Sequence, residues 1–400
     1  MKRGRKTRGL LRKALVPALL VGLAACQSGG DVADVLDPGA AKGNQTGGAE
    51  ASGAAQKPIT LGKGTMKVAM LLPLSASGSL GEEGRKMRDG AQLAMSDMGN
   101  DLITLTIEDT RGDGALAKKK TVEAMGSGAK AVIGPAELPA ARQLAQVSGT
   151  KRPPVLALAE NFAGSPGIYS VRLSEADSAA AAAAALAAKG KRKFVLFVAQ
   201  GAGSDAVAKR VENSLSIYGA LLTVTMPYTT VGGGEEKAVA DMAALVERPD
   251  AVVIASGGGN PSAIVSPLKS KGLLGKGVAL IGTSRWLAQP LDDPLLDGAY
   301  IAALDAAETG PIATRFKATF NYDADVNVAY AYDMVALTAG IASAAGPKGL
   351  TRQVLENPTG FRGSTGLFRF RADGASERSM PFYQVRNGSL KQIDKSISGF

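Results

Sequence analysis

A repeated alternation of fully apolar runs with amphipathic segments constrains this chain more than any other sequence feature. In the first instance an apolar run at 68–72 ends at Pro73, a Ser/Gly-rich loop follows, and apolar residues recur at helical spacing up to Met98. A run that is apolar at every position suits a strand buried on both faces of a parallel sheet, and proline cannot continue the ladder. Residues 66–98 therefore predict a strand, a polar loop and an amphipathic helix.

The same unit recurs along the chain. Further strands are expected at 103–108, 130–133, 155–159, 193–199, 221–225, 251–255 and 278–281. Further helices are expected at 115–125, 138–147, 176–188, 206–218, 237–246 and 262–271. Strands that alternate with helices of this length are typical of a parallel, doubly wound sheet. Two such series predict an α/β fold with two doubly wound parallel-sheet lobes, joined by a hinge near 171–177 and separated by a cleft.

The remaining segments complete the expected lobes. The first lobe takes about 66–175 and part of 300–345, and the second takes about 176–298 and the C-terminal crossings. A helix at 329–344 and a Gly-rich hairpin region at 361–374 are expected to return to the lobes across the hinge. Ser174 and Asp177, at the start of helix 176–188, have the spacing of a capping box, with Asp in the place of Glu or Gln. Its alanine run, 179–185, is too short to cross a bilayer and predicts a tightly packed helix.

The N-terminus has the features of a secretion leader. Seven Lys and Arg residues precede the first acidic residue, an apolar run covers 14–23, and Leu-Ala-Ala-Cys ends at Cys26, the only cysteine. The run is too short for a stable membrane helix. The segment resembles the bacterial lipobox, which implies a signal peptide at 1–25 and a lipidated Cys26. With Gln27 next, the resemblance implies a periplasmic protein anchored to the outer membrane; residues 26–65 are then the lipidated Cys and a flexible tether.

Composition argues against catalysis and nucleic-acid binding. The net charge of +10 falls to 10 − 7 = +3 without the leader's seven cations, too little for a nucleic-acid surface. The chain has no histidine, which excludes Ser/His/Asp and Cys/His triads and an ordinary Cys/His zinc site. An envelope hydrolase is therefore a weak alternative. We expect no enzyme activity, no cofactor and no metal.

Residues beyond the carboxyl ends of the strands are the first binding candidates. Ligands of open α/β sheets bind at these ends, which points to Ser75, Ser77 and Ser79 after the opening strand. Trp286, the sole tryptophan, follows a strand end beside Arg285. It is either a core residue or a stacking or cation-π wall of the site.

Several motifs in a fixed order resemble one family. They are LLPLS after the opening strand, GAQLA at 90–94, IEDTRGD at 107–113, AVIGP at 131–135, AYD at 331–333 and TGLFRFRADG at 365–374. Residues 66–393 resemble the type I periplasmic binding proteins of the Leu/Ile/Val-binding group. The resemblance implies a two-lobed, non-catalytic binder that closes on an amino-acid-like or peptide-like solute for an ABC importer.

A branch with the same fold gives the alternative. Lipoprotein activators of penicillin-binding proteins share the LLPLS opening and an outer-membrane lipidation signal. The alternative is therefore a regulator of a peptidoglycan synthase, in which the cleft is degenerate.

The family's site residues carry over only in part. The loop that holds the ligand carboxylate carries Glu137, which would repel a carboxylate, and the loop that pairs the ammonium carries Glu160 and Asn161. The family's acidic partner falls near Ser284, beside Arg285 and Trp286. Positions of clamping aromatics correspond to glycines at 203 and 257–259. The loop with Ser75, Ser77 and Ser79, called the serine loop below, is therefore interpreted as half of a modified or abandoned amino-acid site.

Overall fold

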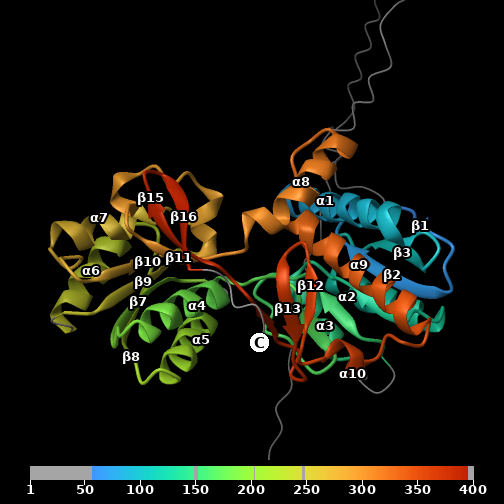
Figure 1. Cartoon of the computed structure of the whole chain (residues 1–400), viewed down its shortest axis with the longest axis horizontal. Helices are drawn as coiled ribbons and strands as arrows, with labels where there is room; N and C mark the ends of the chain where they lie inside the picture. Colours follow the sequence, from blue (N-terminus) through green and yellow to red (C-terminus); the bar gives the residue numbers. More distant parts are fainter. Residues whose placement is uncertain (1–55, 148–151, 202, 246–247, 395–400) are drawn as a thin grey trace, which may run out of the picture. The chain divides into compact units, whose positions relative to one another are not determined.

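The computed structural model describes residues 56–147, 152–201, 203–245 and 248–394. The predicted leader, Cys26 and most of the predicted tether lie outside these residues. Within them the fold is α/β with two parallel-dominated sheets, as the sequence predicts (Figure 1).

The first sheet is built around the opening strand. Its order is β1-β3-β2-β4-β5-β6. The strands are β1 (Ile59–Leu61), β2 (Met66–Leu72), β3 (Ile103–Asp109), β4 (Ala131–Ile133), β5 (Val155–Ala157) and β6 (Ile168–Ser170). β2 pairs in parallel with both β3 and β4. Because helices cover both faces, β2 is buried along nearly its whole length, which explains its continuous apolar run.

The first strand lies in the expected tether. Ile59–Leu61 pairs antiparallel with β3, with Ile59 opposite Ile107. The backbone N–H of Gln56 also donates to Asp109 Oδ2 at 2.9 Å. Regular structure therefore begins before Met66. The sequence does not reveal this strand, because a short edge strand pairs on one side only and has no buried apolar run.

Two helix layers enclose the first sheet. α1 (Gly78–Ala94), its π-helical continuation Met95–Gly99 and α9 (Val326–Ala345) share one core with one face. α2 (Gly114–Gly126) and α3 (Leu138–Leu144) lie on the other face. Gly90 of α1 meets the backbone of Val328 of α9 so closely that a Cβ would lie 2.6 Å from its carbonyl oxygen. These elements, with α8 (Ala306–Phe320), form the first lobe.

The second sheet has the order β16-β15-β11-β10-β9-β7-β8. The strands are β7 (Lys193–Ala199), β8 (Leu221–Tyr228), β9 (Ala251–Ala255), β10 (Ala279–Ile281), β11 (Tyr300–Ala302), β15 (Phe382–Arg386) and β16 (Ser389–Asp394). α4 (Glu175–Ala188) and α5 (Ser204–Ser216) cover one face, and α6 (Gly234–Leu245) and α7 (Ser262–Ser270) the other (Figure 1). This sheet and its helices form the second lobe.

Helix α4 confirms the predicted capping box. Ser174 Oγ accepts from the N–H of Asp177 at 3.1 Å, and Asp177 Oδ2 accepts from the N–H of Ser174 at 3.3 Å. Ala179, Ala182 and Ala183 are fully buried against the sheet and α5. The alanine run is a packed helix, as predicted.

The predicted hairpin region packs on the first lobe. It forms a third sheet of β12 (Phe361–Gly363), β13 (Gly366–Phe370) and β14 (Ser376–Arg378). Buried Asp333 of α9 accepts from the N–H and hydroxyl groups of both Ser364 and Thr365. The Ala-Tyr-Asp motif therefore holds the turn between β12 and β13.

Helix α9 is long and apolar enough to span a membrane by length and composition. However, 61% of its apolar window is buried inside the protein. Its apolar residues pack against the first sheet and the third sheet. This arrangement accounts for the apolar sequence as that of a core helix.

Candidate functional site

A cavity of about 560 Å³ lies where loops from both lobes meet. The first lobe contributes residues after β5 and β6 and from α8 and α9, and the second contributes the 3-10 helix Ser284–Ala288 that follows β10. Its lining includes the side chains of Glu160, Arg172, Leu287, Leu304, Ile312 and Tyr330.

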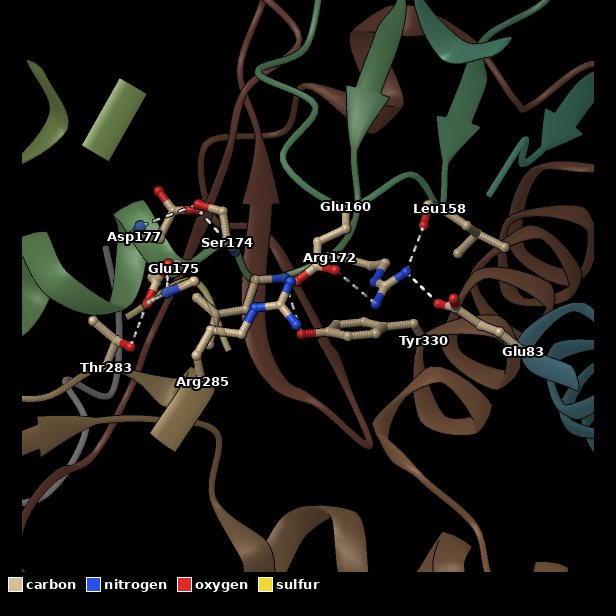
Figure 2. Close-up of polar contacts among 12 residues, drawn as sticks. Glu83, Leu158, Glu160, Arg172, Ser174, Glu175, Asp177, Thr283, Arg285 and Tyr330 are labelled. Carbon is tan, nitrogen blue, oxygen red and sulfur yellow. Dashed lines mark hydrogen bonds and ion pairs between the residues drawn. The ribbon is translucent and has the colours of Figure 1, made fainter. Parts of the chain in front are cut away.

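Glu160 is the central polar group of the cavity. Its carboxylate forms an ion pair with Arg285 of the second lobe and a second one, at 3.6 Å, with Arg172 of the first lobe (Figure 2). The two guanidinium groups therefore converge on one carboxylate from different lobes. Charge-assisted contacts of this kind are the stronger ones in proteins, particularly with partial burial.

Arg172 is held in place from its other side. Glu83 of α1 forms an ion pair with it, and the carbonyl oxygen of Leu158 accepts from Arg172 Nη1 at 3.4 Å (Figure 2). Only 11% of the Arg172 side chain is exposed. Its guanidinium is therefore a fixed element of the first lobe.

The loop that carries Arg285 is fixed on helix α4. The backbone N–H of Ser284 donates to Ser178 Oγ at 2.8 Å, and Thr283 Oγ1 donates to Glu175 Oε1 at 2.8 Å. Burial raises the pKa of the Glu175 carboxyl, while the bonds from Thr283 and Gly257 and the charge of Arg285 act in the opposite direction. Ser284 and Arg285 both line the cavity.

The other side of the cavity is apolar. Leu287 and Leu304 come from opposite lobes, Ile312 from α8 and Tyr330 from α9. The Tyr330 hydroxyl accepts from the N–H of Leu173 at 2.9 Å, and Arg378 lies 5.0 Å from the ring centroid. Burial raises the pKa of Tyr330. The site thus combines a charged end with an apolar wall.

The serine loop lies outside this cavity. Ser75 donates its backbone N–H to Asp109 Oδ1 at 3.2 Å, Ser77 is the N-cap residue of α1, and Ser79 is exposed in its first turn. None of the three lines the cavity. Their positions follow from the turn between β2 and α1, where Gly78 adopts a φ of 65°.

Glu137 and Asn161 are also separate from it. Glu137 is 7% exposed and accepts from Thr110 Oγ1 at 3.0 Å; burial is the main cause that raises the pKa of its carboxyl. Asn161 follows Glu160 directly, but it lines another cavity of about 380 Å³ with Gly203 and α5. The backbone of Asn161 is left-handed, with a φ of 55°, and the neighbouring residues Glu160 and Asn161 line different cavities.

Trp286 is a core residue rather than a wall of the site. Its side chain is fully buried in the second lobe, and Nε1 donates to the carbonyl oxygen of Ile254 at 3.2 Å. Gly282 lies against the indole, where a Cβ would approach to 2.6 Å. Its neighbours Arg285 and Leu287 face the cavity instead.

Arg172 and Tyr330 line the cavity but were not predicted from the sequence as site residues. Arg172 is the one charged residue in the stretch Ile-Tyr-Ser-Val-Arg-Leu at the expected hinge, and an isolated charge next to a strand is the available sequence signal for it. Tyr330 precedes the Ala-Tyr-Asp motif and has no local signal. Among the residues that the structure describes, no three His, Cys, Asp or Glu side chains are grouped to hold a metal ion.

Comparisons with known proteins identify the family. A family model described as "Periplasmic binding protein" matches residues 65–389. No curated protein matches the chain.

Solved structures similar to this chain share the fold at low identity. A putative branched-chain amino acid ABC transporter from Rhodospirillum rubrum has a TM-score of 0.70 and 17% identity, covering 82% of this chain and 99% of its own. The substrate-binding protein LivJ from Streptococcus pneumoniae, in complex with isoleucine, has a TM-score of 0.58 and 19% identity, covering 83% and 99%.

A third structure has a different ligand. The solute-binding protein of an ABC transporter from Rhodopseudomonas palustris BisB5, in complex with 3,4-dihydroxy benzoic acid, has a TM-score of 0.58 and 16% identity, covering 84% and 97%. With the family match over most of the chain and two parallel-dominated sheets in one fold, this chain belongs to the periplasmic binding protein family and has its type I fold.

Proposed function

We propose that this chain is a non-catalytic periplasmic protein that binds a small amino-acid-like or peptide-like solute between its two lobes. The observation that carries the proposal is the cavity in which Arg172 and Arg285, from different lobes, converge on Glu160. A cavity with an apolar wall and a few convergent polar groups is the usual form of a small-molecule site.

The composition of the cavity supports a solute with both polar and apolar parts. The guanidinium groups offer donors for a carboxylate, and Glu160 offers an acceptor for an ammonium group. Leu304 and Ile312 offer apolar surface for a side chain. The related structures named above include complexes with isoleucine and with an aromatic acid.

The binding proposal is tested by calorimetry and native mass spectrometry. Protein purified from its own periplasm should retain a small molecule, and titration with amino acids and dipeptides should give heat and thermal stabilisation. Arg285→Gln should weaken the binding, while Lys237→Gln, which changes an exposed pair within α6, should leave it unchanged. Absence of a retained molecule, of heat and of stabilisation would contradict solute binding.

We also propose that Cys26 carries a lipid that anchors the protein to the outer membrane. The support is the basic start, the short apolar run and the single cysteine after Leu-Ala-Ala. Cys26→Ala should shift the protein from the detergent phase to the aqueous phase in a partition experiment. Retention of the variant in the detergent phase would contradict the anchor.

The second candidate is an activator of a penicillin-binding protein. One observation favours it: Ile217 and Leu221 of the second lobe are 78% and 66% exposed, and the half-exposed Tyr218 lies between them in the sequence. Exposed apolar and aromatic side chains that are close together in the sequence are candidates for a protein interface. Stimulation of glycan polymerisation by a purified synthase, lost on Ile217→Ser with Leu221→Ser, would support it; no capture and no stimulation would contradict it.

A further inference from the structure

We propose that Glu160 is an internal carboxylate that occupies the place of a ligand carboxylate, so that the preferred ligand is a carboxylic acid with an apolar body that displaces Glu160 from Arg285. The inference rests on the proposed solute-binding function and names the substrate class of that same cavity. It also makes Glu160 a residue that lowers the affinity for ligands.

The guanidinium groups of Arg172 and Arg285 together form the binding site for such a carboxylate, which we call the seat. Arg172 is fixed by Glu83 and by the carbonyl oxygen of Leu158 and stays in place when Glu160 leaves. Arg285 has Glu160 as its acidic partner within ion-pair distance in the described part of the chain. Displacement of Glu160 would therefore leave Arg285 ready for another carboxylate.

The exposure of the three side chains allows this exchange. Arg172 is 11% exposed, whereas Glu160 is 26% exposed and Arg285 is 34% exposed. A released Glu160 carboxylate can therefore reach solvent without being buried unpaired, which would be costly. Arg172, the least exposed of the three side chains, is the fixed part of the seat, and Glu160 is the group that moves.

The apolar wall selects the rest of the ligand. Leu287, Leu304 and Ile312 line the cavity beside the charged end. An alkyl or aryl body gains free energy by burial against these side chains. A zwitterionic amino acid is different, because its ammonium group would use Glu160 as a partner.

Competition by a tethered carboxylate has a measurable consequence. Glu160 is presented to the arginines at the effective concentration of an intramolecular group, on the order of millimolar. The apparent affinity for a ligand carboxylate is reduced by the fraction of protein in which the seat is occupied. Removing the charge of Glu160 should therefore increase the affinity for carboxylates.

The experiment compares the full chain with Glu160→Gln by calorimetry at neutral pH. The probes are benzoate and isocaproate, with benzamide and isocaproamide as neutral counterparts. We expect Glu160→Gln to bind the two carboxylates about tenfold more tightly than the wild type, or to bind them where the wild type does not, with no gain for the amides. Glu212→Gln, an exposed glutamate of α5, is the matched control.

Two further variants keep the test decisive. Arg285→Gln in the Glu160→Gln background should remove the gain, because one half of the seat is lost. Glu160→Ala serves if Glu160→Gln does not fold. Equal or weaker carboxylate binding in the Glu160 variants, or an equal gain for the amides, would overturn the inference. If the amino-acid and dipeptide titrations still give heat, solute binding stands and this inference alone falls.

Discussion

Glu160 and Arg285 form an ion pair that joins the loop after β5 of the first sheet to the 3-10 helix after β10 of the second. The two residues are contributed by different lobes, and Arg172 holds the same carboxylate within the first lobe. The pair therefore links the two lobes directly.

Loss of this pair should loosen the contact between the lobes. Arg285→Gln removes the charge that attracts Glu160, so we expect a larger radius of gyration in small-angle X-ray scattering without added solute. Added salt should produce part of the same change in the wild type, since partly exposed pairs are screened. Lys237→Gln should leave the radius unchanged; an unchanged radius in Arg285→Gln as well would contradict the link.

Asp333 should be a major determinant of stability. Its carboxylate is 3% exposed and accepts hydrogen bonds from Ser364 and Thr365. Asp333→Ala leaves those donors unpaired, and we expect a loss of about 3 kcal/mol in the free energy of unfolding, measured in urea. The control is Asp323→Ala, whose side chain is 83% exposed in its pair with Lys317; a similar loss there would argue against the assignment.

Glu137 should make the stability depend on pH. Burial raises the pKa of its carboxyl, so the folded protein keeps this proton to a higher pH than the unfolded chain. The contribution of this group is therefore most favourable below the pKa of the unfolded chain, and it declines as the pH rises through the raised pKa of the folded state.

Glu137→Gln should remove that decline. Relative to the wild type, the variant should gain stability as the pH rises from about 4 to about 7, because it has no charge to bury. Urea unfolding at several pH values measures the difference, with Glu212→Gln as the exposed control. A difference that does not change with pH would exclude Glu137 as the source.

The contact between α1 and α9 should tolerate no side chain at Gly90. A Cβ there would lie 2.6 Å from the carbonyl oxygen of Val328, so Gly90→Ala should cost about 2 kcal/mol by forcing the helices apart. Gly340→Ala, on the same α9, meets nothing within 4 Å and should stabilise the protein by about 0.5 kcal/mol. Thermal and urea unfolding distinguish the two; equal effects would contradict the close approach.

Trp286 should matter for folding and little for binding. Trp286→Phe removes the hydrogen bond to Ile254 and leaves space in the core, at a cost of about 2 kcal/mol. Affinity for any solute found by calorimetry should change by less than about twofold. In the wild type, iodide should quench the fluorescence of this single tryptophan only weakly. A large loss of affinity without a loss of stability would instead show that Trp286 belongs to the binding site.

The sequence by itself determined the α/β fold, most element positions and the capping box of α4, because these depend on local periodicity and on side chains three residues apart. The family resemblance proposed Glu160, Ser284 and Arg285 as site residues, and these three line the cavity. Strand β1 was not predicted, because its short edge run has no such signal. Only the tertiary structure decided that Trp286 faces the core and that Arg172 meets Glu160. Which face of a turn a side chain takes, and which partner crosses from the other lobe, depend on packing between segments more than a hundred residues apart, as for Glu160 and Arg285.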